Sequence, residues 1–438
     1  MVLCCRSVAG SLACGVLPLA VMLRRTTPNL AAADDTTSRT ATLRVRSGLL
    51  VVQTALAVVL LVGATLTVRS FHAIQRVQLG FDPEGLVTFD VVVPDGKYKR
   101  DVNRRFYRQA LERVRQLPGI SEASAVYLRP FEFGPIGSGV AVVLEGQSPR
   151  DRAAWRKQPS LNSEAVTPDY FRVMRIPLLE GRAFTERDDE HVPPVAIVSA
   201  SAARRLWPGQ NPIGKRLMAS DDRTRERWRT VIGVVGEVRY RGLMEASLDL
   251  YTPYGQSEDA VKHFIVNASG APSSTLGPLR AQIRSLDPDA VVDAIRPMRV
   301  VVDRQVAPWR FAALLFSLLA ALALVVAVAG IYALLAYHVA ERTREIGIRM
   351  ALGARQNQIV WFIVLRTSLA LGAGLLTGVV TALVAGRPLN ALLFGVTRAD
   401  PASYAIVPVL LLVAAAVGAW RPIRHAVAID PVVALREK

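Results

Sequence analysis

Residues 209–216 have the glycine and lysine spacing of a loop that binds nucleotide phosphates. They read Gly-Gln-Asn-Pro-Ile-Gly-Lys-Arg. In such a loop, a strand leads in and a serine or threonine after the lysine binds magnesium. Here Arg216 occupies the magnesium position, and a Leu-Trp-Pro run precedes the loop. The sequence therefore favours a turn that ends a helix, with Gly209 and Gly214 in backbone conformations that suit glycine.

Histidines, cysteines and carboxylates show no spacing typical of a catalytic or metal site. All three cysteines fall within the first 14 residues, so the large central segment can hold neither a disulfide nor a thiolate metal site. The acidic run at residues 188–190 is typical of a solvated loop. We therefore expect no enzyme activity, no cofactor and no metal. The five histidines are scattered along the chain: His72, His191, His263, His338 and His425.

Arginines give the chain a formal net charge of +17 and recur at alternate positions 223, 225, 227 and 229. A basic chain of this kind can bind nucleic acid. The orientation derived below places this segment outside the cytoplasm, so we expect no nucleic-acid partner. Alternation of this kind favours the solvated face of a hairpin over a lipid-binding patch.

The segment from Glu341 to Ala354 combines charged residues with helical spacing. Glu345 and Arg349 form a favourable i,i+4 pair, and Gly347 and Gly353 permit a bend or a close approach by another chain. One interpretation is a helix anchored at the membrane lipids by its arginines. The other is a lever held by a cytoplasmic partner. Periodicity alone does not separate the two.

Long apolar segments position the charged residues described above. The chain is 51% hydrophobic and only 20% charged, and its apolar residues are concentrated into blocks without charge. A helix of about 20 apolar residues crosses the hydrocarbon core of a bilayer. We therefore predict four transmembrane helices, at residues 47–68, 311–337, 359–386 and 401–420, the third with Arg366 near one end or facing protein.

Short basic connections orient these helices, because lysine and arginine are retained on the cytoplasmic side. Residues 24–46, the loop at 338–356 and the tail at 421–438 each carry at least four basic residues. The loop between the last two helices offers only Arg387 and Arg398. We therefore place residues 69–310 outside the cytoplasm, between the first helix and the later three.

The large outer segment shows two similar β-α-β patterns. Strands at 86–93 and 120–127 flank a helix at 102–117, and strands at 264–267 and 291–294 flank a helix at 275–286. The repeated order suggests a split β-α-β lobe next to the membrane. Residues 139–254 are richer in short strands and turns, with strands at 195–198 and 231–238, and form a second, inserted lobe.

The first 40 residues contain an apolar run at 7–23 between Arg6 and Arg24. A signal peptide is one interpretation. Pro18 and the lack of a convincing cleavage site favour a short or truncated transmembrane helix followed by a cytoplasmic linker.

Several of these segments resemble one family. Residues 341–354 are similar to the cytoplasmic signature of the MacB/FtsX-type ABC transporter permeases, and the tail at 421–436 resembles the closing segment of that family. Residues 167–171, 181–184, 194–198 and 207–216 resemble the MacB-like periplasmic core. The chain is most like the second half of an acidobacterial duplicated orphan permease, in which case residues 1–40 are the remnant of a preceding unit.

The resemblance implies a fold and a function. The fold is a four-helix transmembrane permease in a 1+3 arrangement, with an FtsX-like domain at 311–431 and a large α+β MacB-like core domain outside the bacterial inner membrane. Coupling to a separate cytoplasmic ABC ATPase is implied for Glu341, Arg342, Arg344, Glu345, Ile346, Gly347, Arg349, Met350 and Gly353. That ATPase would drive movement of the outer domain for export or other work in the envelope, a mechanism called mechanotransmission.

Further partners follow from the same resemblance. They are membrane lipids, a second copy or a homologous permease unit, and a membrane-fusion or outer-membrane protein. The alternative function is an envelope-binding or sensory membrane protein that derives from such a permease and has no ATPase. A neighbouring ATPase gene would favour transport, whereas its absence would favour the sensory protein.

Overall fold

The computed structural model describes residues 35–94, 100–132, 139–220, 227–244, 246–257, 261–268, 272–341, 356–386 and 393–427. The chain divides into two compact units. We call Met1–Val59, Ala321–Ala382 and Val407–Lys438 the membrane unit, and Leu60–Ala320 with Leu383–Ile406 the outer unit. Each unit is described by itself.

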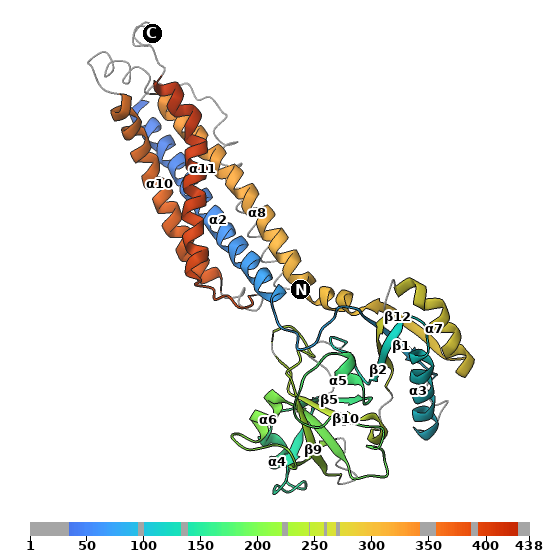
Figure 1. Ribbon diagram of the computed structural model, residues 1–438. Coiled ribbons are helices and arrows are strands. Elements are labelled where there is room, and N and C mark those ends of the chain that lie inside the picture. The colour runs from blue at the N-terminus through green and yellow to red at the C-terminus, as the bar shows by residue number, and fades with distance from the viewer. Residues whose placement is uncertain are drawn as a thin grey trace. The chain divides into compact units, whose positions relative to one another are not determined.

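Four long helices run through the described chain: α2 (Asp35–Gln75), α8 (Met298–Glu341), α10 (Gln356–Ala385) and α11 (Pro401–Val427) (Figure 1). Each contains a segment long and apolar enough to cross a membrane. This confirms the predicted four helices in a 1+3 arrangement. Helix α8 begins at Met298 instead of residue 311, because the turns before the charge-free segment 311–337 are also helical and bury Met298 and Val301 in the core of the outer unit.

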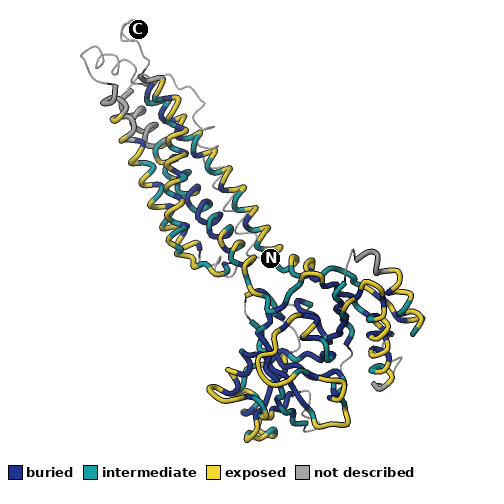
Figure 2. Tube along the Cα trace, in the orientation of Figure 1, coloured by how far each residue is buried: buried dark blue, intermediate teal, exposed yellow. Residues whose placement is uncertain are grey.

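Glycines set the packing of the membrane unit. A Cβ atom added to Gly374 of α10 would lie 2.6 Å from the Cβ atom of Thr54 in α2, and one added to Gly378 would lie 2.5 Å from that of Val58. Small residues four apart allow the backbones of two membrane helices to approach closely. Large apolar side chains on the opposite faces are exposed, as the yellow outer faces of the helices show in Figure 2. These faces suit contact with lipid.

The outer unit contains the predicted split β-α-β lobe. Its strands have the order β12-β1-β11-β2, and all neighbours are antiparallel. Phe89 and Phe264, on neighbouring strands, stack with ring centroids 5.3 Å apart in the core under the two helices. The bounds are β1 (Leu86–Val92), α3 (Arg100–Arg115), β2 (Ile120–Val126), β11 (His263–Ala268), α7 (Pro272–Leu286) and β12 (Val291–Pro297).

The inserted segment continues the same sheet in the order β5-β10-β7-β9-β8-β4, with β5 beside β2. It is therefore a second lobe with its own core but without a separate sheet. The strands are β3 (Gly139–Val140), β4 (Val142–Leu144), β5 (Leu161–Val166), β6 (Leu178–Gly181), β7 (Val195–Ser199), β8 (Arg216–Ala219), β9 (Arg229–Val235) and β10 (Asp249–Pro253). The helices are α4 (Arg152–Lys157), α5 (Tyr170–Val173), α6 (Ala200–Leu206) and the 3-10 turn η3 (Tyr254–Gln256).

The turn at 209–214 has the predicted conformation: it follows α6, and Gly209 and Gly214 have φ angles of 69° and 83°. Two charged residues are less exposed than the sequence predicted. Of the alternating arginines, Arg229 is buried at the start of β9 and Arg227 is half-buried, whereas Arg223 and Arg225 lie outside the described residues. Asp188 is also buried, because it accepts two hydrogen bonds of 2.8 Å from Arg182 and one from the Thr185 amide.

Candidate functional site: helix roots and a lobe joint in the outer unit

The outer ends of α2 and α8 are part of the core of the outer unit. Ile74 near the end of α2, and Met298 and Val301 at the start of α8, are all buried in one hydrophobic cluster. The same cluster contains Tyr170 and Ile265, which belong to the two lobes. We call these buried ends the helix roots. Because interiors are close-packed, a displacement of either root must move the side chains around it.

The connection between α10 and α11 is tied to the outer end of α2. Arg69 of α2 forms an ion pair of 3.3 Å with Asp400, and the Ser70 hydroxyl accepts a 2.7 Å hydrogen bond from the Phe394 amide. Asp400 also accepts hydrogen bonds from the amide and hydroxyl of Ser403 at the start of α11. The outer end of α2 and the start of α11 therefore share contacts through this connection.

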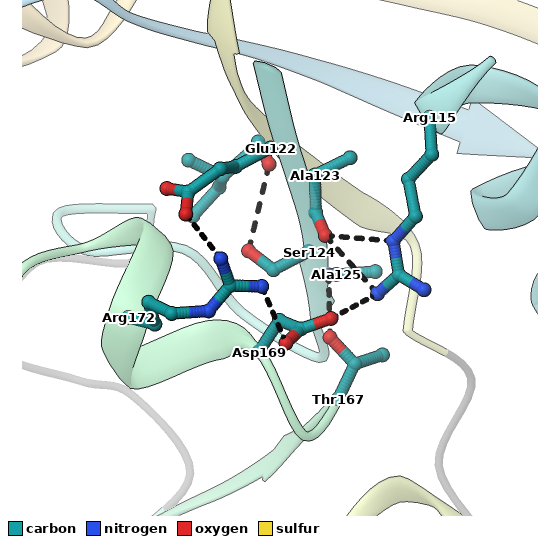
Figure 3. Close-up of polar contacts among 9 residues, drawn as sticks. Arg115, Glu122, Ala123, Ser124, Ala125, Thr167, Asp169 and Arg172 are labelled. Atoms are coloured by element: carbon teal, nitrogen blue, oxygen red, sulfur yellow. Dashed lines mark hydrogen bonds and ion pairs between the residues drawn. The ribbon is translucent and has the colours of Figure 1, made fainter. Parts of the chain in front are cut away.

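Asp169 joins the two lobes of the outer unit (Figure 3). One of its carboxylate oxygens pairs with Arg115 at the end of α3, and the other accepts a 2.7 Å hydrogen bond from Arg172 of α5. Arg172 also pairs with Glu122 of β2. We call this set of four side chains the lobe joint.

Further hydrogen bonds, from backbone amides to a hydroxyl and to carbonyls, continue the lobe joint where β2 meets β5. The Ala125 amide donates to the Thr167 hydroxyl at 2.9 Å, and the Thr167 amide donates back to the Ala125 carbonyl at 3.0 Å (Figure 3). The Tyr127 amide donates to the Ala165 carbonyl. Only one residue pair, Val126 and Val166, is in ladder register between these strands. The lobes are thus connected by a short seam, which side chains reinforce.

A buried polar network lies in the interior on the β5 side of this seam. Glu164 is fully buried, accepts a 3.0 Å hydrogen bond from the Leu128 amide and lies 3.4 Å from Arg241. Burial raises the pKa of Glu164 well above its usual range. Asp249 of β10 accepts a 2.9 Å hydrogen bond from Asn162, and burial raises its pKa to about 7.

A third polar cluster lies between β1 and β11. Ligand atoms of Asp90, Glu132 and His263 lie within 4.8 Å of one another. The buried Arg129 pairs with both carboxylates, and His263 contacts Asp90 at 2.7 Å. Burial acts to raise the pKa of Asp90, but His263 and Arg129 outweigh it and lower the pKa. The guanidinium supplies the positive charge that a metal ion would otherwise bring, so the cluster functions as an internal ion-pair network.

The predicted coupling residues fall largely outside the described chain. Glu341 ends α8, and residues 342–355 lie outside the described residues. Their contribution to a site therefore stays a prediction. Sequence reasoning missed Arg69, Arg115 and Asp400, although Asp169 lies inside the segment 167–171 that carried the family resemblance.

The family comparison agrees with this architecture. The family model "MacB-like periplasmic core domain" matches residues 47–296, and the model "FtsX-like permease C-terminal" matches residues 317–431. The chain belongs to the MacB/FtsX-type ABC transporter permeases. Members of this family are multi-pass proteins of the inner membrane with a periplasmic domain, and they work with a cytoplasmic ATPase. The outer unit therefore carries the periplasmic domain.

Curated relatives of this MacB/FtsX-type permease are export proteins. One is the macrolide export ATP-binding/permease protein MacB of Mannheimia succiniciproducens, 27% identical over 291 residues, which are 63% of this chain and 43% of that protein. Another is the pyoverdine export ATP-binding/permease protein PvdT of Pseudomonas aeruginosa, 28% identical over 61% of this chain and 41% of that protein. The chain thus spans less than half the length of these relatives.

A solved structure also matches the permease. It is the periplasmic region of MacB from Actinobacillus actinomycetemcomitans, with 18% identity and a TM-score of 0.34 over 51% of this chain and 94% of that one.

Proposed function

We propose that this permease couples ATP hydrolysis by a separate cytoplasmic ATPase to a conformational change of its periplasmic domain. The observation that carries the proposal is the continuity of α2 and α8. Each helix is unbroken from its apolar span to a root that is buried in the core of the outer unit. A movement at the cytoplasmic end of such a helix reaches the periplasmic core without crossing a flexible loop.

The lobe joint extends this route. The root of α8 follows directly after β12, so it belongs covalently to the split β-α-β lobe. From there, Arg115 and Asp169 link that lobe to the inserted one. A displacement that begins at α8 therefore has packed and ionic contacts through which it can reach the second lobe. The work done is export or another mechanical task in the envelope.

The cytoplasmic end of the proposed route is the segment after α8. The coupling residues there would hold the ATPase, which can bias the permease only through contacts that differ between its conformations. A second permease unit, either another copy or a homologue, and a membrane-fusion or outer-membrane protein complete the proposed assembly. The ATP-binding part in the names of the curated relatives supports the need for such a partner.

A charge reversal tests the coupling step. We expect Glu345→Arg combined with Arg349→Glu to keep the i,i+4 pair. Each position would then carry the opposite charge toward the ATPase, so stimulation of ATP hydrolysis by the permease should fall. The permease and its ATPase are reconstituted together in lipid, and hydrolysis rates are compared.

The matched control reverses an exposed pair on the periplasmic side, Arg204→Glu with Glu237→Arg. This control should stimulate hydrolysis like the unmodified permease. If the double reversal at 345 and 349 also leaves stimulation unchanged, with normal expression and insertion, the segment is only an interfacial anchor and the proposal fails.

A further inference from the structure

A long apolar groove lies within the membrane unit, between α10 and α11. Its volume is about 650 Å³. Leu371 and Leu375 of α10 and Leu411 and Leu412 of α11 line it, and α2 and α8 supply part of the floor. A Cβ atom added to Gly372, which also lines the groove, would meet no atom within 4 Å. There is thus open space beside this glycine.

The groove follows α11 along much of the membrane thickness. Its lining extends from Pro408 to Arg424. At 1.5 Å per residue, these positions are about 24 Å apart along the helix. The hydrocarbon core of a bilayer is about 30 Å thick, so the groove is long enough for the chain of a lipid that occupies one leaflet.

One end of the groove carries a positive charge. Arg424 lines it, with the guanidinium carbon 5.3 Å from the centre of the Trp420 ring, which also lines it. This is the cytoplasmic end, because α11 starts beside Asp400 at the periplasmic side. Within the described part of the chain, Arg424 forms no ion pair. The Arg424 side chain is exposed, so an anionic group can reach it.

We propose that this groove binds an anionic phospholipid of the cytoplasmic leaflet, with an acyl chain between α10 and α11 and the phosphate at Arg424. Basic pockets between helices on the cytoplasmic side are suited to anionic head groups. The apolar lining along the groove and the positive charge at one end match the two parts of such a lipid.

Two pairs of variants test this proposal. Gly372→Leu fills the groove, whereas Gly48→Leu makes the same change at another helical glycine that has no neighbour within 4 Å and does not line the groove. Arg424→Gln removes the charge at the groove, whereas Arg421→Gln removes an exposed charge on the same helix outside the lining.

The measurement is native mass spectrometry of the full chain, titrated with phosphatidylglycerol or phosphatidylethanolamine. We expect Gly372→Leu to lose one tightly bound lipid. We expect Arg424→Gln to reduce the preference for phosphatidylglycerol about fivefold, which corresponds to about 1 kcal/mol for one basic residue near the membrane surface. Both control variants should bind lipid like the unmodified chain.

Three outcomes would overturn the proposal. Gly372→Leu could retain all bound lipid, which would place the lipid elsewhere. Arg424→Gln could leave the head-group preference unchanged. Finally, Gly372→Leu could convert a dimer into a monomer with the same amount of bound lipid, which would show that a second copy occupies the groove.

Discussion

At the residue scale, the lobe joint depends on one carboxylate that serves two guanidinium groups. Asp169 contacts Arg115 and Arg172 with separate oxygens, and both arginines are held by further contacts. Paired charges hydrogen-bonded in this way are more directional than single surface ion pairs. The joint therefore adds ionic contacts between two lobes that share few backbone hydrogen bonds.

We expect Asp169→Ala to weaken the outer unit. The substitution removes both ion pairs, and because Asp169 is about 30% exposed, the loss of unfolding free energy should be about 1 kcal/mol. Thermal unfolding of the full chain in detergent measures it. Glu237→Ala, which breaks only an exposed pair with Arg204, should change stability by less than half as much. Equal effects would show that the joint contributes no more than a surface pair.

Asp249 makes stability depend on pH in an unusual direction. Its pKa of about 7 in the folded protein lies above the ordinary aspartate value of about 3.9. Between these values, the folded state holds a proton that the unfolded state has released. The free energy of unfolding should therefore fall as pH rises from about 4 to about 7. Above about pH 7, Asp249 is ionised in both states and contributes no further change.

Asp249→Asn should remove the share of this dependence that comes from Asp249, because an amide resembles the protonated acid and can still accept from Asn162. Glu164, whose pKa is also raised by burial, keeps a share of the same sign. We expect the variant to match the unmodified chain near pH 4 and to be more stable at pH 8. Denaturant unfolding at several pH values measures the slopes. Asp151→Asn, an exposed helix cap, is the control and should leave the slope from pH 5 to 7 unchanged. An unaltered slope in Asp249→Asn would mean that another group binds the proton.

Sequence patterns could not reveal these residue contacts. Arg115 and Asp169 are far apart in the chain, and hydrophobic periodicity reports only which face of a local element is buried. The same limit explains why Asp188 and Arg229 were predicted to be solvated. Asp188 is buried because Arg182 and Thr185 of the same loop donate to its carboxylate, and a loop conformation of this kind has no periodic signal. Arg229 is buried at the start of β9. By contrast, the conformations of Gly209 and Gly214 follow from local turn chemistry and were predictable.

At the element scale, the sequence predicted the six elements of the split β-α-β lobe to within three residues at each end. Alternating strands and capped helices produce strong local patterns. Helix α8 was the main difference, since hydropathy marks only the part of a helix that contacts lipid. Its first turns are polar on one side and bury Met298 and Val301 on the other, so they were not recognised as part of the same helix.

The contact between α10 and α2 can be tested through its glycines. Gly374→Ala and Gly378→Ala should each destabilise the membrane unit by about 1–3 kcal/mol, because the added methyl group overlaps Thr54 or Val58. Gly372→Ala, on the same helix with open space around it, should be neutral or slightly stabilising. Thermal unfolding in detergent provides the comparison. If all three variants have the same thermal stability, the backbones of α2 and α10 do not lie as close together as described.

At the scale of the whole molecule, the basic connections and the buried helix roots both place the outer unit on the periplasmic side of the membrane. A reporter fused after Val143 should be periplasmic, and reporters fused after Gln356 and Lys438 should be cytoplasmic. Paired alkaline phosphatase and green fluorescent protein fusions measure this, since each reporter is active on one side only. Cytoplasmic activity after Val143 would contradict the arrangement of one helix followed by three.

The position of β1 in its sheet has a consequence for biogenesis. β1 lies between β11 and β12, and Asp90 pairs in register with His263 and Asp293. Both neighbours are synthesised long after β1, and at 5–20 residues per second the delay is on the order of ten seconds or more. During export, β1 therefore waits at the membrane with both edges unpaired. A nascent strand of this kind is prone to wrong pairing, so the cell must keep it separate from other chains until translocation delivers its partners.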